Sequence, residues 1–172
     1  MTVREASRSD VLLAEFIREL RLEGLDAPFE GELEEPFTGR VIAPFTAKFL
    51  RRLNTPSLVL RNDGAQQPFR IYLDGMAFIP DVEIGEYTER LLAFEVKFLR
   101  DVDPSGCAAK ALGQAVVYRS GGAHNAVALL IDLRTTGSSA LTRRIAWALP
   151  EGVTVLWLKR SKRDKMELSS TP

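Results

Sequence analysis

The sequence predicts an α/β fold in one domain, with a central mixed sheet of four to five strands flanked by helices. Residues 78–98 alternate apolar and polar side chains on both sides of a short polar turn, which is typical of an antiparallel hairpin. Asn125–Asp132 is almost wholly apolar, as in a strand that is buried on both faces. A helical pattern lies between these stretches, so residues 91–132 are expected to form a crossover unit that joins parallel strands.

Composition limits the class of protein. The chain has 172 residues, enough for one domain, and its hydrophobic content of 45% and charged content of 27% are usual for a soluble globular protein. Cys107 is the only cysteine, which excludes an internal disulfide and a cysteine-based zinc site. No apolar run reaches the roughly 18 residues of a membrane span. We therefore expect a cytoplasmic protein without a membrane partner.

Two helices are expected before the hairpin. Ser9 or Asp10 could cap a first helix that runs to about Glu23, where Gly24 follows as a stop signal. A second helix is expected over residues 44–54, because proline is tolerated in the first turn and the apolar residues keep helical spacing.

The remaining residues before the hairpin are less regular. Residues 25–43 are expected to be an irregular part of an N-terminal arm (1–43), with a short strand near 40–43. Leu58–Arg61 and Phe69–Leu73 have strand-like composition and are bounded by turn residues. The arm contains an acidic cluster whose spacing supports no metal role, so we expect a solvated loop with Glu30, Glu32, Glu34 and Glu35.

After the hairpin, the pattern predicts helix, strand, helix and strand. The first helix covers Pro104–Ser120 and has a face of small residues suited to packing on a sheet. Ser138 or Ser139 could cap a second helix to Leu149, and a last strand is expected over 152–158. Residues 159–172 are expected to be a flexible tail, whose cations suggest an anionic partner: Lys159, Arg160, Lys162, Arg163 and Lys165.

One face of the hairpin carries the candidate functional side chains. Asp81 lies on one strand, and Glu95 and Lys97 share a face of the other. With the turn centred near Tyr87, Asp81 is expected opposite Ala93 and diagonal to Glu95. Two carboxylates at this spacing suit Mg²⁺, which prefers oxygen ligands, and the lysine could orient a water or stabilise charge on a phosphate.

These residues resemble the PD-(D/E)XK nuclease superfamily, whose fold is called restriction-endonuclease-like. Pro80-Asp81 matches its PD, and Glu95-Val96-Lys97 matches its (D/E)XK. The resemblance implies a Mg²⁺-dependent or Mn²⁺-dependent deoxyribonuclease that hydrolyses DNA through a Mg²⁺-activated water. It implies that Asp81, Glu95 and Lys97 are catalytic residues and that the two acids, Asp81 and Glu95, also bind the metal.

The resemblance extends to two helices. Many members of the superfamily place a glutamate on the first helix, which here implies Glu15 as a third metal ligand. The alternative is a solvated helix face. Gln114 and Tyr118 resemble the Gln-x-x-x-Tyr element of RecB-like nucleases, and Lys110 lies on the same stripe. The likeness implies that these three residues bind substrate; the alternative is a half-exposed helix face.

We therefore expect a DNA-cleaving enzyme, and a homodimer if both strands are cut. Two other functions stay open. The same fold could bind nucleic acid or a protein without cutting, or the charged hairpin could belong to an unrelated α/β interaction protein. The sequence lacks a Walker-type glycine loop, a GxSxG motif and a histidine pair for zinc.

Overall fold

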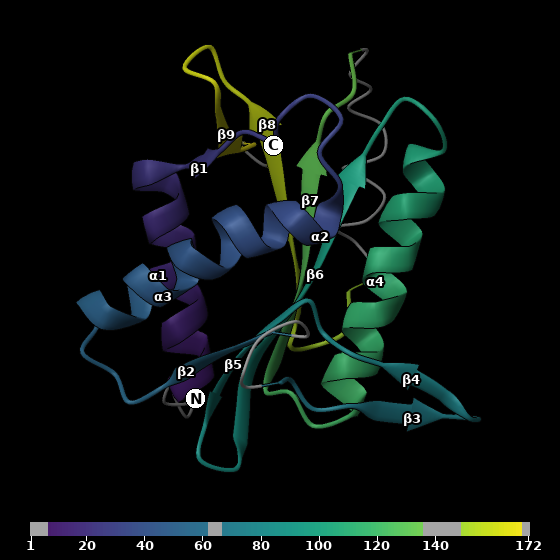
Figure 1. Cartoon of the computed structure of the whole chain (residues 1–172). Coiled ribbons are helices and arrows are strands. Elements are labelled where there is room, and N and C mark those ends of the chain that lie inside the picture. The colour runs from purple at the N-terminus through teal and green to yellow at the C-terminus, as the bar shows by residue number, and fades with distance from the viewer. Residues whose placement is uncertain (1–6, 62–66, 136–148, 170–172) are drawn as a thin grey trace, which may run out of the picture.

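The computed structural model describes residues 7–61, 67–135 and 149–169. Within these ranges the chain forms a mixed sheet with helices on both faces (Figure 1). The α/β class is confirmed. The sheet has seven strands rather than four to five, and two short strands that the sequence did not predict contribute to the difference, β1 (Leu25–Asp26) and β9 (Lys165–Leu168).

The centre of the sheet is parallel and its margins are antiparallel. The strand order is β1-β9-β8-β7-β6-β5-β2. The pairs β6–β7 and β7–β8 are parallel, whereas β5 and β9 run antiparallel to their neighbours. The five longer strands are β2 (Leu58–Arg61), β5 (Val82–Glu86), β6 (Glu89–Leu99), β7 (Asn125–Asp132) and β8 (Val153–Arg160).

Helix α4 (Pro104–Ser120) connects β6 to β7 and covers one face of the sheet, as predicted. Its buried alanines Ala108, Ala111 and Ala115 pack with the sheet residues Ala126 and Ala128. Small side chains on both surfaces allow the helix to lie close to the strands, which brings the polar ends of longer helix residues within reach of β6.

The opposite face is covered by α1 (Arg8–Glu23) and α3 (Ala43–Arg52) (Figure 1). Ser7, rather than Ser9 or Asp10, caps α1 and forms a capping box with Asp10. Ser9 is instead buried. Ring contacts hold the two helices to the sheet: the Phe16 ring lies 5.0–5.6 Å from the rings of Phe45, Phe49 and Phe94.

The N-terminal arm is more helical than expected. Helix α2 (Glu34–Phe37) continues through a π-type turn at Thr38–Ile42 into α3. The strand expected near residues 40–43 is therefore wrong. Phe37, Val41 and Ile42 recur at helical spacing and are buried in the core, so tertiary packing favours the helix.

The strand expected from residue 78 to 84 is divided. Its first residue belongs to β4 (Met76–Phe78), which pairs with β3 (Ile71–Leu73) in a separate hairpin. The predicted turn at Asp74-Gly75 closes this hairpin, and both residues have positive φ (48° and 78°), as a tight hairpin turn requires. Residues 79–81 cross from this hairpin to the main sheet.

Residues 159–168 of the expected tail belong to a strand pair rather than to a free tail. Strand β8 extends to Arg160, and β9 returns along it and also pairs with β1. The helix expected from Ser138 or Ser139 falls on residues 136–148, which lie outside the described ranges.

The ring cluster generates the first prediction. Phe16→Ala should lower the free energy of unfolding by about 3–5 kcal/mol, because a fully buried ring is replaced by a cavity. Urea unfolding followed by circular dichroism measures this change. Val11→Ala, at an exposed position of the same helix, should change it by less than about 0.5 kcal/mol. Equal effects of the two substitutions would contradict the packing described.

Candidate active site

The site forms where β5 separates from β6. The two strands pair as far as Val82↔Phe94, and the Asp81 N–H donates the next bond to the Phe94 carbonyl at 3.0 Å. Before Asp81 the chain belongs to the crossing segment from β4. Among the described strands, only β7 pairs with residues 95–99 of β6, so this half of β6 has an open edge.

Two carboxylates accept the backbone hydrogen bonds that a neighbouring strand would otherwise accept. The Val96 N–H donates to Asp81 Oδ2 at 2.7 Å, and the Phe98 N–H donates to Glu34 Oε1 at 2.8 Å. Backbone donors left without a partner in a protein interior cost free energy. The hydrogen-bonding pattern of an open strand edge therefore fixes two acids side by side along β6.

Glu95 and Lys97 point to the face of the sheet that α4 covers. Lys97 Nζ lies 2.7 Å from Glu95 Oε1 and 3.3 Å from Glu34 Oε2. Glu95 Oε2 accepts a hydrogen bond of 2.6 Å from the Tyr118 hydroxyl. The Glu95 side chain is 2% exposed and that of Lys97 is 14% exposed, so the cluster opens to solvent on the side of Asp81, Lys97 and Glu34.

The protonation of the cluster follows from burial and from its charges. Burial and the nearby Glu95 raise the pKa of Asp81 to about 7, although the Val96 N–H and Lys97 partly oppose the rise. Burial disfavours the charged amine of Lys97, but Glu95, Asp81 and Glu34 outweigh it and raise the Lys97 pKa. Lys97 is therefore a cation at neutral pH and cannot act as a base.

The Tyr118 side chain is buried and connects α4 to the acidic cluster, rather than lying exposed where it could contact a substrate. Its hydroxyl lies within hydrogen-bond distance of the Ile79 carbonyl (3.0 Å) as well as of Glu95. Burial and the Glu95 charge raise the pKa of Tyr118, so the hydroxyl keeps its proton. Gln114 Oε1 is buried and has no hydrogen-bond partner among the described residues. Lys110, exposed on the same helix, lies about 12 Å along the axis from Tyr118.

Glu15, which the resemblance implied as the third acid, is not brought to this cluster. It lies on α1, across the sheet from α4, and its carboxylate pairs with Arg18 at 2.5 Å. The structure brings in Glu34 of α2 instead. Sequence reasoning did not find Glu34 because the glutamates of residues 30–35 have no informative spacing, and the contact with Lys97 spans 63 residues.

The expected register is also corrected. Ala93 pairs with Glu83, not with Asp81, for two reasons: the turn is centred between Tyr87 and Thr88 rather than on Tyr87, and the β5–β6 ladder shifts between Ile84 and Gly85. Together these two changes place Asp81 two residues further along β6, beside Glu95 rather than diagonal to it. Glu83 is a second buried acid on this face, and its carboxylate is paired with Arg90 at 3.0 Å.

The donor atoms fit a hard cation. Asp81 and Glu95 offer carboxylate oxygens, and the charge of Glu95 helps to raise the Asp81 pKa, a repulsion that a cation between them would offset. Mg²⁺ commonly takes one or two carboxylates and completes its shell with waters. No three histidine, cysteine, aspartate or glutamate side chains within the described ranges form a preassembled ligand group. By their oxygen donors, Asp81 and Glu95 are the pair that would hold Mg²⁺ or Mn²⁺.

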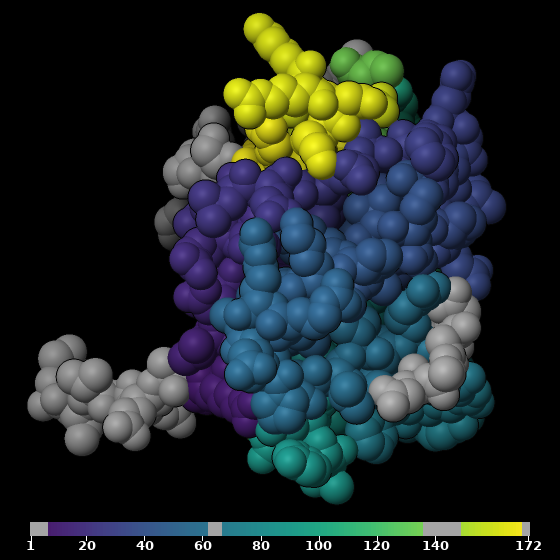
Figure 2. All heavy atoms as spheres, turned by 60° about the vertical axis from the view of Figure 1, so that its left-hand side comes forward, coloured from purple at the N-terminus to yellow at the C-terminus, as the bar shows by residue number. Residues whose placement is uncertain are grey.

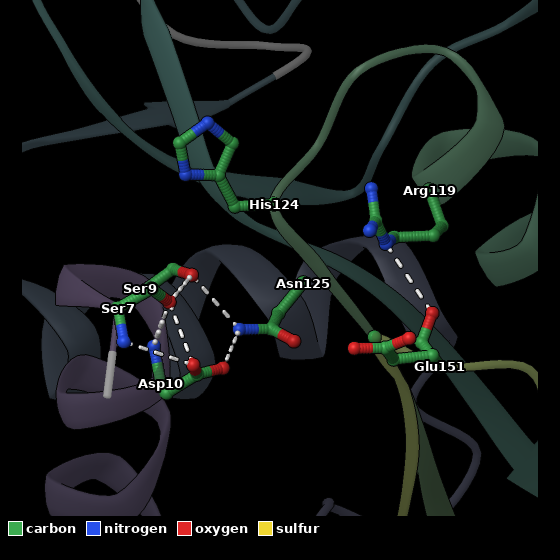
Figure 3. Close-up of a pocket in the computed structure, with 8 residues that line it drawn as sticks. Ser7, Ser9, Asp10, Arg119, His124, Asn125 and Glu151 are labelled. Atoms are coloured by element: carbon green, nitrogen blue, oxygen red, sulfur yellow. Dashed lines mark hydrogen bonds between the residues drawn. The ribbon is translucent and has the colours of Figure 1, made fainter. Parts of the chain in front are cut away.

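A separate polar pocket of about 320 Å³ contains none of the predicted site residues (Figure 3). Asn125, at the start of β7, donates from Nδ2 to Ser9 Oγ and Asp10 Oδ1, both at 2.9 Å. These bonds fix the first turn of α1 to the sheet. The pocket lining also includes His124, Arg119 and Glu151.

Comparisons of the chain with protein-family models, curated proteins and solved structures found no match. The assignment of the candidate site therefore rests on the geometry of this chain and not on a relative. None of the helices in the described part of the chain has both the length and the apolar character needed to cross a bilayer.

The raised pKa of Asp81 generates a pH prediction. A carboxyl whose pKa is higher in the folded state retains a proton that the unfolded chain releases, so the contribution of Asp81 to the stability of the wild type should be lost as the pH rises from about 4 through about 7. Asp81→Asn cannot ionise and still accepts from the Val96 N–H. Its melting temperature relative to wild type should therefore be higher at about pH 8 than at about pH 4.5. The exposed Asp74→Asn is the control, and identical pH profiles for both variants would refute the assignment.

Proposed function

We propose that this protein is a metal-dependent nuclease that hydrolyses DNA phosphodiester bonds. The observation that carries the proposal is the convergence of Asp81, Glu95 and Glu34 around Lys97 at the open edge of β6. Asp81, just before β5, and Glu95 and Lys97, on the adjacent β6, also follow the order of the PD-(D/E)XK motif that they resemble.

In the proposed reaction, Asp81 and Glu95 hold Mg²⁺ or Mn²⁺, and Glu34 supplies the third acid in place of Glu15. The bound ion would lower the pKa of a water molecule and offset the charge that develops on the phosphate. Three carboxylates against one amine leave the cluster with an excess of negative charge when all are ionised. This excess favours a divalent cation over a bare phosphate.

Lys97 has the role of a fixed positive charge. Its raised pKa keeps it protonated, so it can donate hydrogen bonds to the attacking water or to a phosphate oxygen. Tyr118 is a positioning residue, since its buried hydroxyl fixes one oxygen of Glu95. Gln114 lies one turn before Tyr118 on the same helix.

A second candidate is a non-catalytic module that binds nucleic acid or protein with the same fold. The pairing of Glu95 favours it, because one carboxylate oxygen accepts from Tyr118 and the other is paired with Lys97. Buried acids in such closed pairs also occur as purely structural networks. This candidate requires neither a metal at Asp81 nor a charge at Lys97 for function.

A cleavage assay separates the two candidates. The wild type should cut plasmid, linear or branched DNA in Mg²⁺ or Mn²⁺ and not in EDTA, with product measured on gels. Lys97→Ala should lower the rate by about 10²–10³-fold, because a fixed charge at the reacting phosphate is lost. Lys48→Ala is the control, since Lys48 pairs with Glu23 on the other side of the sheet. Undiminished cutting by Lys97→Ala would refute the proposed mechanism.

Paired glutamate variants test which acid completes the site. Glu34→Gln should lower metal-dependent cleavage by about 10–100-fold, while its amide oxygen can still accept from the Phe98 N–H and keep α2 in place. Glu15→Gln should leave the rate unchanged, because its carboxylate contacts Arg18 on the other face. The reverse result would restore the assignment of Glu15 and exclude Glu34.

A further inference from the structure

The β8–β9 hairpin concentrates positive charge in a chain whose formal net charge is zero. Residues 159–168 contain five lysines and arginines against two acids, Asp164 and Glu167, which leaves a formal charge of +3. In Figure 2 this yellow segment forms a projection at the top of the molecule, with side chains that extend away from the body.

Only part of this charge is neutralised within the protein. Arg160 pairs with Asp164 at 2.9 Å, and Lys165 pairs with Asp26 at 2.5 Å. Lys159, Lys162 and Arg163 are exposed and form no ion pair with any described residue. Glu167 lies opposite Lys159 in the strand register without pairing to it. Three cations are therefore available to an anionic partner.

The sheet places the first of these cations, Lys159, near the candidate site. The register aligns Leu99 of β6 with Asp132 of β7 and with Lys159 of β8, two strands away. Lys97 precedes Leu99 by two residues, so the backbone at Lys159 is about 12 Å from that at Lys97. Lys159 follows Trp157 by two residues and therefore shares the α4 face with Lys97.

That separation suits a nucleic-acid backbone. A duplex rises about 3.4 Å per base pair, so about 12 Å corresponds to three or four pairs. Three acids of the intervening arm are paired within the protein, Asp26 with Lys165, Glu32 with Arg40 and Glu34 with Lys97, whereas the exposed Glu30 and Glu35 oppose this field. A duplex that is contacted at Lys97 and runs toward β8 would thus reach the hairpin within a few base pairs.

We propose that the β8–β9 hairpin binds the phosphate backbone of duplex DNA a few base pairs from the scissile bond, through Lys159, Lys162 and Arg163. This proposal rests on the proposed nuclease function and adds a substrate class to it, since a duplex arm must extend beyond the cleavage point. Phosphate contacts of this kind supply affinity without sequence readout.

Salt dependence of binding tests the proposal. Binding of a fluorescent duplex of about 20 base pairs is measured by anisotropy in EDTA, over roughly 50–200 mM salt. Lys162→Gln with Arg163→Gln should reduce the slope of log K against log salt by about 2, because each lost phosphate contact removes about 0.9. The matched control, Arg21→Gln with Arg51→Gln, removes two exposed charges from α1 and α3 and should leave the slope unchanged.

Each outcome decides the question. A reduced slope in the hairpin variant alone supports the proposal. An unchanged slope, or an equal change in the control, overturns it. Binding of polyglutamate is measured in the same way. If the hairpin variant loses binding to polyglutamate but still binds DNA as the wild type does, the partner is an acidic protein and the proposal is overturned. If the wild type binds the duplex through the hairpin yet cuts no DNA in Mg²⁺ or Mn²⁺, the nuclease function fails while the duplex-binding surface stands.

Discussion

The open edge of β6 is the constraint on which the rest of the site depends. Where β5 leaves β6, the N–H groups of Val96 and Phe98 need acceptors, and carboxylates of Asp81 and Glu34 provide them. A hydrogen-bonding requirement of the backbone thus gathers acids that would otherwise repel one another. The same contacts that complete the sheet also create the candidate cation site.

The gathered charges can be balanced in two ways. Without a cation, burial and the charge of Glu95 favour the protonated form of Asp81 at a pKa of about 7. With a divalent cation, the acids can all ionise, and the free energy of binding would compensate for their desolvation. A site that holds either a proton or a metal ion is expected to respond to pH near neutrality, which links the electrostatics of the fold to its proposed chemistry.

The two helical layers have different tasks. Helices α1 and α3 bury large rings against one face and supply the apolar core. Helix α4 packs through alanines on the other face, and this close approach lets Tyr118 reach Glu95 from within the protein. Large side chains on one face therefore stabilise the sheet, while small ones on the other face position a polar cluster on it.

The sequence by itself determined the features that depend on local periodicity: the α/β class, the hairpin around residue 87, the β6–α4–β7 crossover, and the shared face of Glu95 and Lys97. Tertiary structure alone decided the strand register, the choice of Glu34 over Glu15, and the pairing of β9 with β1 and β8. The reason is physical. Alternation along a strand is fixed by its own residues, whereas a ladder shift or a contact across 63 residues depends on how separate segments share one core.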